Sequence, residues 1–178
     1  MSRLNIVILV VSIIGGISLS AADHDLYRYS VSATGGFSIN SSDTHLDNGL
    51  NLGLRYTQNV PTSYPWEVGA YQFSFDYSGD TDYNNGAGET SISRFGVNLL
   101  WFMDNQSEIT PFLLAGTGLE FFSNEADNDD GLFGTIGGGV EYQIKGDLSF
   151  LAEGKWIYAG DNDSYFLTNF GIKYSFGQ

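Results

Sequence analysis

Ten charged side chains recur in segments that otherwise alternate between apolar and small polar residues. The bases are Arg28, Arg55, Arg94, Lys155 and Lys173, and the acids are Glu67, Asp76, Glu120, Glu141 and Glu153. All ten fall on the polar parity of their segments, and buried charges are costly unless they are paired. The matched numbers favour internal ion pairs, with Lys155, Lys173, Glu141 and Glu153 expected in one cluster. An ion path or gate through the same residues is the alternative.

A second set of carboxylates lies in four polar stretches that contain no Lys or Arg. Its members are Asp43, Asp47, Asp80, Asp82, Glu89, Glu125, Asp127, Asp129, Asp130, Asp161 and Asp163. Asp127, Asp129 and Asp130 are weak candidates for a calcium site. Gly131 is out of register for a calcium-binding loop, and no bidentate glutamate follows it. A solvated acidic surface is the simpler interpretation, and divalent-cation binding is the alternative.

Nucleophilic catalysis has one weak candidate. Of the two histidines, His45 has Ser41, Ser42 and Asp43 nearby in the sequence, and such a loop histidine is more often solvated than catalytic. Three consecutive glycines at 137–139 lie within an alternating segment rather than in the strand-to-helix turn that binds phosphate. The chain has no cysteine, which excludes disulfides and thiolate metal sites. We therefore predict no catalytic residue, no cofactor and no enzyme activity.

Eight alternating segments must position the charged residues. They are about Tyr27–Ile39, Leu50–Thr57, Trp66–Tyr77, Thr90–Phe102, Ile109–Phe122, Leu132–Ile144, Leu148–Tyr158 and Tyr165–Phe176. A period of two indicates a strand with one apolar and one polar face. Long polar connections follow the first, third, fifth and seventh segments, and an even number of strands lets the last one pair with the first. The predicted fold is all-β, an eight-stranded antiparallel up-and-down transmembrane β-barrel.

Two segments are ambiguous in phase. In the third, Trp66, Val68 and Ala70 have the opposite parity to Tyr71, Phe73, Phe75 and Tyr77, and a bulge near Gly69 would reconcile them. In the fifth, we choose the phase that places Leu113, Ala115, Thr117, Leu119 and Phe121 outward and Gly116, Gly118 and Glu120 inward.

The apolar faces distinguish a membrane barrel from a soluble, lipocalin-like barrel. A small barrel has too little interior volume for eight columns of Phe, Tyr, Leu and Trp, so these residues are expected to face lipid. Tyr27, Tyr29, Tyr56, Trp101, Tyr142 and Tyr174 fall near the short-turn end, as an interfacial aromatic belt would. The net charge of −14 argues against binding of nucleic acid.

The N-terminus has the order of a secretory signal peptide. Arg3 precedes an apolar run, Ile6–Ile17, which is followed by small residues up to Ala22. The run is shorter than the roughly 20 residues that a membrane-spanning helix needs. We predict a Sec-type signal peptide over residues 1–22, cleaved after Ser20 or Ala22, and one barrel domain over residues 23–178.

The last segment carries a further pattern. Asn169, Gly171, Tyr174 and Phe176 resemble the polar-x-Gly-x-x-aromatic-x-aromatic signal that closes bacterial outer-membrane barrels, although Gly177 and Gln178 follow it here. With the stretches 110–121, 137–144 and 151–158, the chain is similar to the small outer-membrane β-barrels, which include OmpA transmembrane domains, OmpX-like proteins and opacity-type surface proteins.

That resemblance implies a place in the outer membrane of a Gram-negative bacterium. The partners it implies are outer-membrane lipid, lipopolysaccharide, which the acidic surface would reach through bridging cations, and the barrel-assembly machinery. We expect a monomer that works as a structural or surface-interaction barrel. A narrow channel for ions or small solutes is the alternative, and a lipid A-modifying enzyme is a more distant one.

Overall fold

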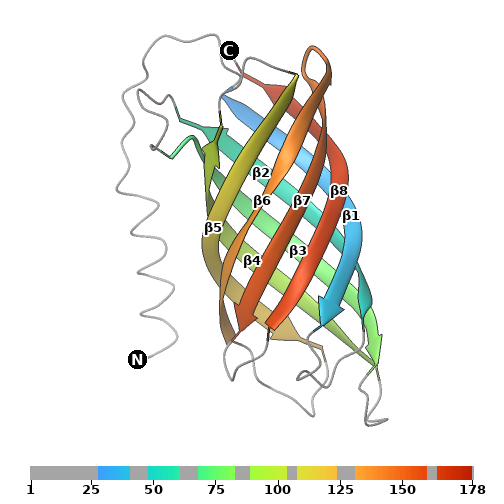
Figure 1. Ribbon diagram of the computed structural model, residues 1–178. Coiled ribbons are helices and arrows are strands. Elements are labelled where there is room, and N and C mark those ends of the chain that lie inside the picture. The colour runs from blue at the N-terminus through green and yellow to red at the C-terminus, as the bar shows by residue number, and fades with distance from the viewer. Residues whose placement is uncertain are drawn as a thin grey trace.

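The computed structural model describes residues 28–40, 48–60, 68–82, 89–103, 108–123, 131–159 and 164–177. They form eight strands, which are β1 (Tyr29–Asn40), β2 (Gly49–Asn59), β3 (Ala70–Asp82), β4 (Glu89–Phe102), β5 (Ile109–Phe122), β6 (Gly131–Lys145), β7 (Leu148–Ala159) and β8 (Ser164–Phe176). Each strand is antiparallel to its neighbours and the sheet closes on itself (Figure 1). The predicted fold class is therefore confirmed. Among the described residues, no helix has the length and apolar character needed to cross a membrane. The expected signal peptide lies outside the described ranges.

The barrel closes through β1 and β8, as the strand count predicts. The register of this seam runs from Tyr29 opposite Phe176 to Asn40 opposite Tyr165. The tight β6–β7 hairpin turns at Gly146, whose φ is 52°, and it lies at the same end of the barrel as the end of β8 (Figure 1). We call this end the turn end. The opposite end, where β1 finishes and β8 begins, is the loop end.

The apolar face of each strand points outward. In β2 the burial alternates from Gly49 to Thr57, so that Leu50, Leu52 and Leu54 are exposed while Asn51 and Arg55 are buried. The same pattern holds around the barrel, where the exposed large residues include Phe95, Ile136, Trp156 and Phe170. A soluble barrel would bury this set, so the outward placement is confirmed and the lipocalin-like alternative is wrong.

The first half of β3 differs from the prediction. Ala70 is fully buried and lies in phase with Gln72, and the backbone pairing continues through Gly69, whose N–H donates to Leu100 O at 2.7 Å. No bulge is therefore needed at Gly69. The register shift between β3 and β4 lies at the loop end instead, between Ser78 and Thr81. Ala70 faces inward because this end of the interior is apolar.

Two apolar clusters occupy the interior. The turn-end cluster consists of Ala70, Leu100, Phe112, Leu114 and Leu151, with Phe102 packed against it. The loop-end cluster consists of Phe133, Ile157, Tyr165 and Leu167, with Ala159 packed against it. Burial of Phe112 and Leu114 and exposure of Leu113 confirm the phase chosen for β5. Apolar residues on the inward parity fill the lumen at two levels, which the polar character of that parity does not predict.

The residue after β8 extends the seam. Gly177 has a φ of 77°, a backbone conformation that favours glycine, and its carbonyl oxygen accepts the Arg28 N–H at 2.6 Å. The Arg28 carbonyl in turn accepts the N–H of Asn59, at the end of β2. Gly177 thus ties the end of β8 to the segment that enters β1.

Candidate functional site: the charged interior

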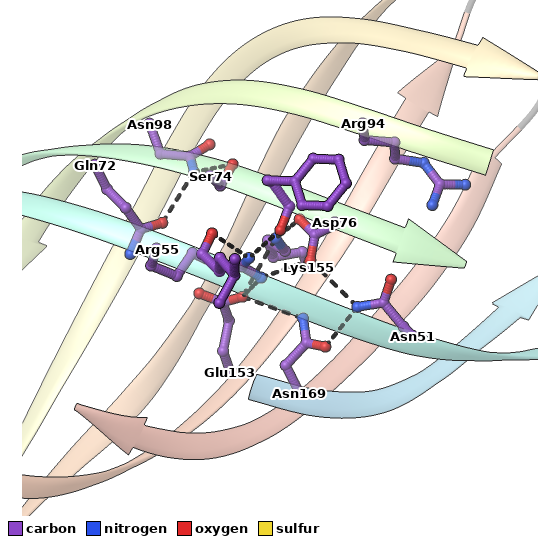
Figure 2. Close-up of polar contacts among 12 residues, drawn as sticks. Asn51, Arg55, Gln72, Ser74, Asp76, Arg94, Asn98, Glu153, Lys155 and Asn169 are labelled. Atoms are coloured by element: carbon purple, nitrogen blue, oxygen red, sulfur yellow. Dashed lines mark hydrogen bonds and ion pairs between the residues drawn. The ribbon is translucent and has the colours of Figure 1, made fainter. Parts of the chain in front are cut away.

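Four charged side chains form a closed ring across the middle of the barrel (Figure 2). Arg55 on β2 contacts Asp76 on β3 at 2.7 Å, and Asp76 contacts Lys155 on β7 at 2.8 Å. Lys155 lies 3.3 Å from Glu153, on the same strand, and Glu153 lies 3.1 Å from Arg55. Positive and negative groups therefore alternate around the ring, and each has two partners of opposite charge. We call these four residues the charge ring.

The charge ring is almost completely shielded from solvent. The side-chain exposure of its members does not exceed 4%. Space for the Arg55 guanidinium comes from Gly53, where a Cβ atom would lie 2.5 Å from Arg55 Nη1. Two bases and two acids leave no net charge, which is the condition under which buried ions are tolerated.

Amide and hydroxyl groups extend the ring toward the loop end. Asn51 Nδ2 donates to Asp76 at 3.2 Å and to Asn169 Oδ1 at 2.7 Å, and Asn169 donates to Glu153 at 3.3 Å. Ser78 Oγ donates to Asn51 Oδ1 at 3.0 Å and accepts from Arg94 Nη1 at 2.9 Å. A continuous hydrogen-bonded path thus joins the charge ring to Arg94.

Arg94 belongs to a second buried group. Its Nε donates to Glu120 at 2.7 Å, and its guanidinium lies 4.7 Å from the centroid of the Tyr165 ring. The Tyr165 hydroxyl donates to Glu120 at 2.7 Å. Tyr165 also belongs to the loop-end cluster, so the polar network ends against apolar side chains on that side.

Lys173 and Glu141 form a separate pair near the turn end. Lys173 Nζ donates to Glu141 at 2.7 Å and lies 5.7 Å from the centroid of the Phe102 ring. The expected cluster of Lys155, Lys173, Glu141 and Glu153 is therefore wrong. Lys173 lies opposite Ser149 of β7 in the strand register. Ser149 comes six positions before Lys155, and six residues of strand span about 20 Å.

Arg28 is a further correction. It precedes β1, and its side chain is exposed rather than inward. Alternation cannot orient a side chain outside the strand that carries the pattern. The remaining inward candidate, Glu67, lies outside the described residues, as do the calcium candidates Asp127, Asp129 and Asp130 and the histidine at position 45. Within the described residues, no group of three or more His, Asp or Glu is placed to hold a metal ion.

The residues of the terminal signal divide between the two faces of β8. Asn169 is fully buried in the polar network, whereas Tyr174 and Phe176 are exposed outside the barrel. Gly171 lies where a Cβ atom would approach Ala33 O of β1. Tyr174 and Phe176 contact each other at 6.2 Å between ring centroids, and Phe176 lies 5.9 Å from Tyr29. These outward rings straddle the seam at the turn end.

Comparison with known proteins identifies the fold through solved structures. No protein-family model matches the chain, and no curated protein does. Among solved structures, Neisserial surface protein A (NspA) aligns with a TM-score of 0.60 at 16% identity, over 83% of this chain and 97% of that one. Ail, the attachment invasion locus protein of Yersinia pestis, aligns at 0.57 and 15% identity, over 83% and 97%. The outer-membrane enzyme PagL aligns at 0.53 and 18% identity, over 82% and 99%.

These neighbours differ in what their names describe. One is a surface protein, one an attachment and invasion protein, and one an enzyme. A second Ail structure contains the heparin analogue sucrose octasulfate. Identities below 20% establish shared architecture and no shared activity. The chain has the fold of the small eight-stranded outer-membrane β-barrels.

Proposed function

We propose that the protein is an integral outer-membrane protein of a Gram-negative bacterium, in which a closed, non-conducting barrel carries an acidic interaction surface. One observation carries this proposal: the neutral charge ring and its hydrogen-bonded extension lie between two apolar clusters within the lumen. Paired charges capped by packed apolar side chains oppose the passage of water and ions. The exposed belt of Leu, Ile, Phe and Trp side chains supports insertion in lipid.

The surface-interaction role rests on the charge of the long connections. These connections and the strand ends beside them contain eleven acids and no Lys or Arg, which gives the loop end a strongly negative potential. Such a surface would repel a polyanion like the sulfated sugar found with Ail. The partner we propose is therefore cationic, either a basic protein surface or divalent cations that bridge to lipopolysaccharide phosphates.

Conductance measurements test the closed barrel. Protein refolded into a planar bilayer should give background current only. Arg94→Ala opens space beside Tyr165, so a new current in this variant would identify Arg94 as part of the plug. Stable unit steps from the unmodified protein would instead support the channel alternative.

One observation favours that alternative. The β1–β2 side of the lumen is polar along its length, with Ser30, Ser32, Thr34, Ser38 and Thr57 all buried. A narrow file of water along these hydroxyl groups would give a small current. The turn-end and loop-end clusters both lie on strands β3 to β8, so they leave this side uncovered by large apolar groups.

Enzyme activity is tested separately, because the fold also supports the enzyme PagL. We propose that this chain has none. Mass spectrometry of lipid A from cells with and without the gene should give identical spectra, and a missing or added acyl chain would contradict the proposal.

Export and assembly complete the proposal. We propose that residues 1–22 are removed on export and that the barrel-assembly machinery recognises β8 through Asn169, Gly171, Tyr174 and Phe176. The exposed position of Tyr174 and Phe176 supports recognition from outside the barrel. Phe176→Ala should then lower the amount of protein in the outer membrane of cells while leaving refolding of the purified chain unchanged. Equal losses in both assays would mean that Phe176 acts through stability alone.

A further inference from the structure

The charge ring consists of two halves that lie far apart until the barrel closes. Arg55 and Asp76 sit on adjacent strands, whereas Glu153 and Lys155 sit two positions apart on β7. Neighbouring strands of a sheet are about 4.8 Å apart, so β3 and β7, four strands apart, would be separated by about 19 Å in an open sheet. In the closed barrel the two strands face each other across the lumen, and the charged atoms Lys155 Nζ and Asp76 Oδ2 are 2.8 Å apart.

Each half is already neutral by itself. Arg55 contacts Asp76 at 2.7 Å within the β2–β3 hairpin, and Lys155 lies 3.3 Å from Glu153 along β7. A strand that enters the membrane with its own counter-charge avoids the cost of an isolated buried ion. When the halves meet, the base of each faces the acid of the other, which adds the contacts Lys155–Asp76 and Arg55–Glu153.

We propose that the charge ring is a closure latch: two self-neutral ion pairs, on the β2–β3 hairpin and on β7, that dock across the lumen and thereby favour the closed barrel with this alignment of β7. The order of the charges on β7 is the essential feature. If Glu153 and Lys155 exchanged places, composition and local pairing would be unchanged, but each group would meet its own sign across the barrel. The proposal concerns the interior alone and does not depend on what the loops bind.

A charge exchange on β7 in two backgrounds tests the latch. The first variant is E153K/K155E in the otherwise unmodified chain. The second places the same exchange in a chain whose other half is neutral, R55Q/D76N, and R55Q/D76N alone is its reference. Glycines lie opposite both β7 positions, Gly139 beside Glu153 and Gly137 beside Lys155. Any steric cost of the exchange is the same in both backgrounds, so the second background measures it.

Closure and insertion are measured separately during refolding into lipid vesicles. The fraction of protein in the compact, boiling-sensitive gel band reports closure. The blue shift of tryptophan fluorescence reports insertion, with Trp156 on the outer face of β7 as a local probe. The matched control is E141K/K173E, since this pair lies outside the ring and its exchange keeps opposite charges together.

The latch predicts that E153K/K155E inserts but closes at least about tenfold more slowly, because like charges at these separations in a protein interior repel by far more than thermal energy. In the R55Q/D76N background the same exchange should change the closure rate by no more than about twofold, as should the E141K/K173E control, because no pair of like charges is created. An equal slowing in both backgrounds would overturn the proposal, since the damage would then be local to β7. Normal closure of E153K/K155E in the unmodified chain would also overturn it. So would closure of R55Q/D76N as fast as that of the unmodified chain, because the contacts across the lumen would then not favour closure.

Discussion

Removal of a single charge from the ring should destabilise the barrel strongly, and Lys155→Met is the sharpest case. Lys155 Nζ lies 2.8 Å from Asp76 and 3.3 Å from Glu153, and its side chain is 3% exposed. Methionine preserves most of the volume and removes the charge. The two carboxylates then share Arg55, which leaves a net charge of −1 in an enclosed space. Breaking a buried ion pair in this way costs about 3–5 kcal/mol of unfolding free energy.

Removal of the opposing charge should restore part of that loss. In Asp76→Asn/Lys155→Met the remaining ions are Arg55 and Glu153, which still pair at 3.1 Å. The double variant should therefore be more stable than the sum of the two single losses predicts, by roughly 1–3 kcal/mol, as expected of residues in direct contact.

Equilibrium unfolding by urea in lipid vesicles measures these differences, with the compact gel band as the readout. Lys145→Met is the matched control, because Lys145 lies exposed at the β6–β7 turn and its replacement should change stability by no more than about 0.5 kcal/mol. If Lys155→Met is as mild as this control, the ring contributes little to stability. Strict additivity of the Asp76 and Lys155 substitutions would refute the argument from charge balance.

Three further predictions concern the wall and the filling of the barrel. Gly36→Ala should abolish the compact gel band, because its Cβ would clash with the carbonyl oxygen of Thr168 across the seam, whereas Gly134→Ala, with no atom within 4 Å, should leave the band intact. Leu54→Lys, at a position 60% exposed on the outer face, should cost about 2–4 kcal/mol in vesicle unfolding if the face is in lipid, and almost nothing if it meets water. Phe112→Ala should cost about 3–5 kcal/mol in the same assay, because it empties the centre of the turn-end cluster; a loss below 1 kcal/mol would mean that this cluster is loosely packed.

Alternation was sufficient to predict which way most side chains point. It placed Arg55, Asp76, Glu120 and Glu153 inward, and the structure buries all four. It also set the strand bounds to within a few residues, because the polarity pattern ends where the long connections begin. Direction in a strand is a local property, and a period of two reports it without knowledge of the neighbouring strands.

Height along the barrel axis could not be predicted in the same way. Strand tilt and stagger determine which inward residues share a level, and these depend on the register of every strand. Lys155 meets Asp76, which is 79 residues away. Lys173, on the strand next to Lys155, instead meets Glu141 at the turn end. Sequence separation therefore gave no guide to the partners within the interior.

The apolar clusters were missed for a related reason, yet the sequence does contain a signal for them. Two of their phenylalanines lie directly opposite a glycine on the neighbouring strand: Phe112 faces Gly139, and Phe133 faces Gly118. A Cβ on either glycine would clash with the ring, at 2.6 Å from Phe112 and 2.5 Å from Phe133. The interior of an eight-stranded barrel is just wide enough for side chains to fill, and a glycine beside a large side chain provides part of the space that it needs. An aromatic residue on the polar parity, paired in register with a glycine, should therefore be interpreted as filling for the lumen rather than as an error of phase.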